Sequence, residues 1–149
     1  MLRRSLILSI CLFAVSQVFS QTNGKVETVS KDVGPIRSSL AYAEVLLRKT
    51  ELLAEIEAYL ADYTEENPKV IDTRFELSIL AKDIDRIYAV RPSETGKLTQ
   101  ALGKLIVRRA ALEVDVSRLL RSYNKDHPNV KRAKQRVKVF ESAIKEILG

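Results

Sequence analysis

The chain has few of the residue types on which catalysis, metal binding and covalent cross-linking depend. Its 149 residues include one cysteine, one histidine, one methionine and no tryptophan. Cys11 lies in an N-terminal apolar stretch that we expect to be removed, which would leave no thiol and no disulfide. A lone histidine, His127, cannot by itself form a zinc site or a catalytic triad. We therefore predict a protein that is not an enzyme and that uses no cofactor or metal.

The N-terminal segment has the pattern of a secretory signal. Arg3 and Arg4 precede a short apolar run, and small or β-branched residues stand before Gln21. We predict a signal peptide at residues 1–20, cleaved near Ser20 and Gln21, and a periplasmic or secreted location. The alternative is an uncleaved anchor, although the apolar run is shorter than the ~20 residues of a membrane span. Export excludes nucleic acid as the partner, which the basic pI of about 9.5 would otherwise suggest.

The chain after the signal divides at about residue 36. Residues 21–36 are polar, contain Gly24, Gly34 and Pro35, and show no sustained apolar period. This composition predicts a flexible leader. Residues 37–149 show regular apolar spacing and are predicted to form one helical domain.

The helical domain contains an internal duplication, in which residues 40–88 recur as residues 100–148. The identical pairs are Ala41/Ala101, Arg48/Arg108, Leu52/Leu112, Leu60/Leu120, Tyr63/Tyr123, Pro68/Pro128, Val70/Val130, Ile84/Ile144 and Ile87/Ile147. These matches preserve a packing pattern and a turn, and they contain no set of acids, bases or metal ligands. The duplication therefore indicates a structural or binding module.

Apolar residues spaced by three and four predict four helices, at residues 37–64, 68–89, 94–124 and 128–148. The connections between them are short, which favours antiparallel neighbours. We predict an all-α fold: a duplicated antiparallel helical hairpin that closes into an up-down-up-down four-helix bundle. The alternative is a pair of extended coiled-coil hairpins that pack only in an oligomer.

Each predicted hairpin turns at the same motif, a tyrosine followed by polar residues, a proline and a valine. The motif residues are Tyr63, Asn67, Pro68 and Val70 in the first copy and Tyr123, His127, Pro128 and Val130 in the second. Proline is favoured at the first helical position, where an N–H would have no partner. We expect Asn67 and His127 to cap the helices that follow, the two tyrosines to staple the helix ends, and Ser93 or Thr95 to cap the third helix. The alternative for the tyrosines is an exposed aromatic pair on which sugars stack.

This turn and its flanking heptads resemble the extracytoplasmic coiled-coil hairpin of polysaccharide co-polymerases, the chain-length determinant proteins, and of related polysaccharide-export proteins fused to tyrosine kinases. The resemblance covers residues 40–88 and 100–148. The membrane spans and the glycine-rich kinase loop of those proteins have no counterpart in this sequence. The resemblance therefore implies the hairpin and a tendency to form homo-oligomers, and it does not imply control of polymer length.

Charge is distributed unequally between the two copies. Residues 21–90 contain 9 basic and 13 acidic side chains, whereas residues 91–149 contain 14 basic and 6 acidic ones. The candidate anion-binding residues of the last helix are Lys131, Arg132, Lys134, Arg136 and Lys138. They are either a solvated helix face or a patch for anionic polysaccharide or lipid head groups. Lys49 and Arg109 occupy equivalent seam positions, where a basic side chain either fixes the register or extends its head outward.

Two functional classes follow from these features. We expect an exported, non-enzymatic binding or structural protein of the cell envelope, associated with polysaccharide export, with anionic envelope polymers or with an envelope protein partner. The alternative is a periplasmic holdase chaperone that holds unfolded clients with basic helical arms.

Overall fold

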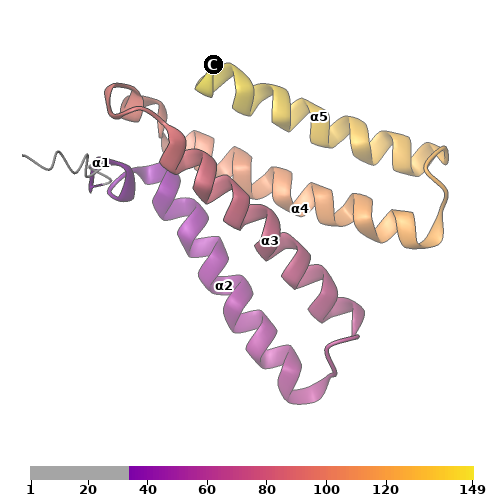
Figure 1. Ribbon diagram of the computed structural model, residues 1–149. Helices are drawn as coiled ribbons and strands as arrows, with labels where there is room; N and C mark the ends of the chain where they lie inside the picture. The colour runs from indigo at the N-terminus through magenta and orange to yellow at the C-terminus, as the bar shows by residue number, and fades with distance from the viewer. Residues whose placement is uncertain (1–33) are drawn as a thin grey trace, which may run out of the picture. The chain divides into compact units, whose positions relative to one another are not determined.

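The computed structural model describes residues 34–149, and every regular element in that range is helical (Figure 1). The elements are α1 (Gly34–Arg37), α2 (Leu40–Asp62), α3 (Pro68–Ala89), the 3₁₀ helix η1 (Pro92–Lys97), α4 (Gln100–Ser122) and α5 (Pro128–Leu148). The predicted all-α class is confirmed. The bounds of α4 and α5 follow those of α2 and α3 at the 60-residue offset, apart from one residue at the C-terminal end.

Helices α3 and α5 begin where the turn motif predicts. Asn67 caps α3, because its side-chain oxygen accepts a hydrogen bond from the Lys69 N–H at 2.9 Å. His127 caps α5 in the same way, through Nδ1, which accepts from the Asn129 N–H at 3.2 Å. Pro68 and Pro128 occupy the first turns, and Val70 and Val130 are fully buried.

The other two long helices begin later than predicted. The Ser39 hydroxyl accepts from the Tyr42 N–H and starts α2 at Leu40, not at residue 37. Thr99 caps α4 through the Leu102 N–H, so the predicted start at residue 94 and the predicted caps Ser93 and Thr95 are wrong.

The physical reason for the second error is a separate local structure. Residues 92–97 form the 3₁₀ helix η1, in which Glu94 pairs with Arg91 and Lys97 on either side. These pairs hold the pKa of Glu94 at about 2, well below its ordinary value. The Thr95 hydroxyl donates to the Pro92 carbonyl oxygen within η1 and is not available as a cap.

The C-terminal end of the predicted leader also requires correction. Gly34–Arg37 form the short helix α1, and the Ile36 side chain is buried in the core. The predicted signal peptide and the rest of the leader lie outside the described residues. None of the helices within residues 34–149 is long and apolar enough to span a membrane.

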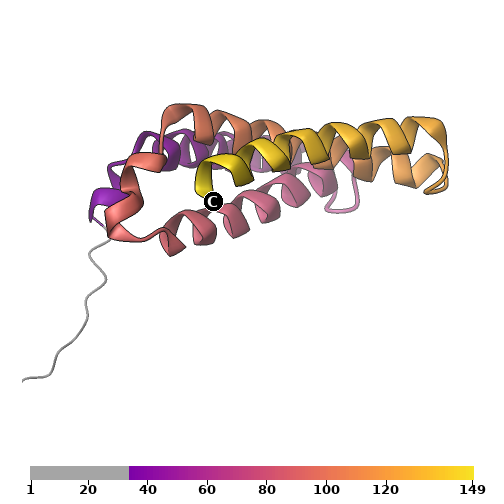
Figure 2. The ribbon, with the colours of Figure 1, turned by 90° about the horizontal axis from the view of Figure 1, so that it is seen from above.

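The long helices pack as two connected pairs that share one core. α2 pairs with α3, α4 packs against both, and α5 packs mainly along α4 (Figures 1 and 2). A closed up-down-up-down bundle would bring α5 back to α2, and α5 has no such extended contact here. The core is centred on α2, α3 and α4 and includes Val45, Leu52, Leu80, Leu102 and Ile106.

Gly103 allows α4 to approach α2 closely. A Cβ atom at this position would lie 2.7 Å from the Glu44 Cβ and 3.0 Å from the Ala41 backbone. Both distances are shorter than van der Waals contact, so the helix spacing at this crossing depends on glycine.

Candidate functional site

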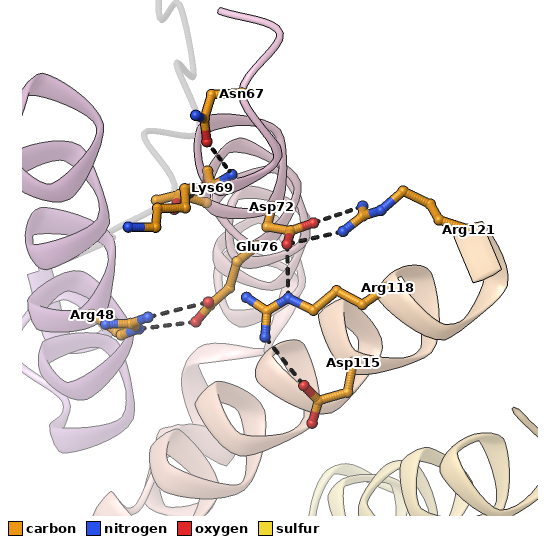
Figure 3. Close-up of polar contacts among 9 residues, drawn as sticks. Arg48, Asn67, Lys69, Asp72, Glu76, Asp115, Arg118 and Arg121 are labelled. Carbon is orange, nitrogen blue, oxygen red and sulfur yellow. Dashed lines mark hydrogen bonds and ion pairs between the residues drawn. The ribbon is translucent and has the colours of Figure 1, made fainter. Parts of the chain in front are cut away.

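Three acidic residues of α3, Asp72, Glu76 and Asp83, are buried. Figure 3 shows the contacts of the first two. Asp72 accepts from Arg118 Nε at 2.7 Å and from Arg121 Nη1 at 2.8 Å, both on α4. Glu76 is bound by Arg48 of α2 in a two-point contact with distances of 2.9 and 3.1 Å. These contacts link α3 to both of its helical neighbours.

The third acidic residue, Asp83, pairs with Arg109 of α4 deep in the interface. Arg109 also contacts Glu113, while its Nε has no hydrogen-bond partner in the described part of the chain. The sequence allowed the Arg109 guanidinium to reach solvent. This alternative is wrong, because the guanidinium is buried and pairs with Asp83. Its counterpart Lys49 is partly exposed and forms no ion pair with any described residue.

Burial and pairing shift the pKa values of these carboxyl groups in opposite directions. Burial opposes ionisation of Asp72, but hydrogen bonds from Arg121 and Arg118 outweigh it and lower its pKa. Burial raises the pKa of Asp83 in spite of Arg109 and Arg86. Each buried acid is thus engaged by arginine, and these ion pairs connect α3 to α2 and α4.

The structure divides the five candidate anion-binding residues of α5 between two sides of the helix. All five are exposed. Lys131, Lys134 and Lys138 are spaced by three and four and lie on one side, whereas Arg132 and Arg136 lie on the other. The Val130, Val137 and Ile144 stripe that faces α4 runs between these two sides, so the five residues predicted as one patch flank it on both sides.

Most of these basic groups have no acidic partner. Lys131 lies 3.6 Å from Asp126, and Arg132 donates to the Asn129 side chain at 2.8 Å. Lys134, Arg136 and Lys138 form no ion pair with any residue of the range 34–149. A run of exposed and unpaired cations is available to bind anions from solution.

The lysine side borders an apolar groove of about 400 Å³ between α3, α4 and α5. Phe75, Val116, Leu120 and Val137 line it together with Lys134, Lys138 and Glu113. The sequence analysis missed this groove because Phe75 lies outside the apolar seam of α3. Its partial exposure in the folded chain is the feature that reveals the groove.

The arginine side borders a second cleft, of about 540 Å³, between α4 and α5. Arg132 and Arg136 line it together with Asp115, Leu119 and Ala133. Both clefts therefore combine basic groups with apolar side chains.

The turn motifs lie at the ends of the two hairpins. Tyr63 and Tyr123 end α2 and α4, where their N–H groups donate to the carbonyl oxygens of Tyr59 and Leu119. Lys69 Nζ lies 5.2 Å from the Tyr63 ring centre, and the Tyr123 ring stacks on His127 at 4.1 Å. Both tyrosines contact the start of the next helix, as expected for a staple, and both retain about two fifths of their exposure.

Comparisons with protein-family models, with curated proteins and with solved structures found no match.

Proposed function

We propose that this protein is a non-enzymatic, exported binding protein that uses the lysine side of α5 to bind an anionic polymer of the cell envelope. The observation that carries the proposal is that Lys134 and Lys138 are exposed beside an apolar groove and form no ion pair with a described residue. An acidic polysaccharide offers carboxylate groups for the lysines and sugar faces for Phe75 and Val137. The same charges would attract anionic lipid head groups, which the experiment separates as a second source.

The test is binding of the purified protein to polygalacturonate at low ionic strength. A variant with Lys131→Gln, Lys134→Gln and Lys138→Gln is compared with a matched control carrying Lys82→Gln, Lys104→Gln and Lys125→Gln, three exposed lysines outside α5. Each lysine near an anionic surface contributes about 1 kcal/mol, so we expect affinity to fall roughly tenfold to a hundredfold in the first variant. The control should change far less, and salt should weaken binding of the wild type.

Vesicles of phosphatidylglycerol provide the second arm of the experiment. Binding to vesicles that exceeds binding to polygalacturonate would assign the lysines to a lipid surface. Equal losses in the lysine variant and in the matched control would show that net charge, and not this side of α5, determines binding.

A holdase chaperone is the second candidate, because the groove at Phe75 and Val137 offers apolar surface edged by cations. Suppression of aggregation of a denatured outer-membrane protein would support it. A Phe75→Gln variant should then lose this activity.

A further inference from the structure

The two hairpins present equivalent helix faces, of which one is covered and the other is not. On α4, the face against α2 and α3 buries Gly103, Ile106, Ala110 and Val114. The residues 60 positions earlier on α2 are Ala43, Leu46, Thr50 and Ala54, and all four are exposed. Both faces have small and apolar residues in the same order, although among residues 34–149 only the first has a partner.

The uncovered face of α2 is unusually apolar for a surface helix. It contains Leu46, Leu47, Leu53 and Leu60, which are between 37% and 59% exposed. Glu57 is the charged residue that lies among them. A surface helix normally directs polar side chains to solvent, so a continuous leucine face indicates a binding surface.

The buried residues of α3 also have exposed counterparts, which lie on α5. On α3, Asp72, Glu76 and Ile79 are buried, and Asp72 pairs with Arg118 and Arg121 of α4. Their counterparts on α5 are Arg132, Arg136 and Val139, which are exposed. In the first hairpin, the cleft at Asp72 and Glu76 receives Arg118 from the second hairpin.

The equivalent cleft of the second hairpin is open. It is lined by residues of α4 and α5 alone, including Arg132 and Arg136. In the first hairpin α4 fills this cleft, and the helix equivalent to α4 in the duplication is α2. We therefore expect the leucine face of α2 from another molecule to fill the cleft of the second hairpin. The charges agree with this pairing, because Arg132 and Arg136 of α5 line the cleft, while α2 contains five acidic and two basic residues.

We propose that copies of this chain associate head to tail, with the leucine face of α2 in one molecule docked on the α4–α5 cleft of the next. The contact would repeat, between molecules, the packing that joins the hairpins within one molecule. Its two surfaces differ, so a chain of copies keeps one free face of each kind until it closes into a ring. Repeat proteins whose end units lack a polar cap associate for the same reason.

The experiment is sedimentation velocity of the purified protein over a range from about 10 μM to about 1 mM, which spans weak and transient contacts. One variant carries Leu46→Gln and Leu53→Gln on α2, and a second carries Arg132→Glu and Arg136→Glu on α5. The lysine variant of residues 131, 134 and 138 is the control, because those side chains lie outside the proposed contact. Circular dichroism melting checks that each variant is folded. Because Arg132 and Arg136 are exposed, the second variant tests the contact even if the leucine variant fails to fold.

The wild type and the lysine variant should associate beyond dimers as concentration rises, while each face variant alone should be monomeric. Mixed together, the two face variants should form a dimer of one copy each, because each keeps the surface that the other has lost. A wild type that stays monomeric throughout, or a mixture that stays monomeric, would overturn the proposal. Self-association of the arginine variant at the wild-type level would instead show that α2 pairs with α2 of another copy.

Discussion

The buried pair of Asp83 and Arg109 gives the sharpest prediction about the stability of the fold. Asp83→Ala removes the acidic partner of a guanidinium whose side chain is 8% exposed. Removing one partner of a buried ion pair lowers the free energy of unfolding by about 3 to 5 kcal/mol, because the remaining charge stays buried without a counter-ion. Glu113 still contacts Arg109 and compensates in part, so we expect a loss of about 3 kcal/mol.

The assay is urea unfolding followed by circular dichroism, with two reference variants. Glu65→Gln removes an exposed partner of Arg74 and should cost less than about 1 kcal/mol. The double variant Asp83→Leu with Arg109→Met replaces both charges by apolar groups and should recover stability to within about 1 kcal/mol of the wild type. A cost for Asp83→Ala no larger than that of Glu65→Gln would refute the reasoning, since it would mean that Arg109 is well solvated.

Further predictions concern packing, capping and acid stability. Gly103→Ala should destabilise the fold by about 1 to 3 kcal/mol in thermal melts, because the new Cβ would overlap Glu44. Asn67→Ala should cost about 1 kcal/mol through loss of the cap on α3, and an unchanged melting temperature would contradict the role of the cap. Asp72 has a folded-state pKa below its ordinary 3.8, so it stabilises the fold above that pH and its contribution is lost as pH falls through the folded value. Asp72→Asn should therefore destabilise the protein at neutral pH and make little difference in strong acid. Mass analysis of the native protein should find Gln21 as its first residue, and an intact Met1 would exclude cleavage of the predicted signal.

The sequence predicted best the features that depend on local chemistry. The starts of α3 and α5 follow from Asn67-Pro68 and His127-Pro128, because proline and its cap act within one turn. The start of α4 was missed, because Ser93, Thr95 and Thr99 are all competent caps. The choice among them depends on the 3₁₀ helix that Glu94 stabilises.

Apolar periodicity does not predict which helices pair, nor which buried acids of α3 pair with arginines. Asp72 and Asp83 look like surface residues in sequence, and their arginine partners lie 46 and 26 positions away, so only the packing of α3 on α4 reveals them. The basic residues of α5 were found by composition. Their separation into lysine and arginine sides follows from helical spacing, together with the position of the stripe that α4 covers.

The most direct test of the proposed function is a map of amide chemical shifts by NMR, with polygalacturonate added to the labelled protein at a concentration where it is monomeric. The account predicts the largest changes at Lys131, Lys134 and Lys138 and along the groove at Phe75 and Val137, with little change on the outer face of α2. Changes spread evenly over all basic residues, or confined to other helices, would contradict it.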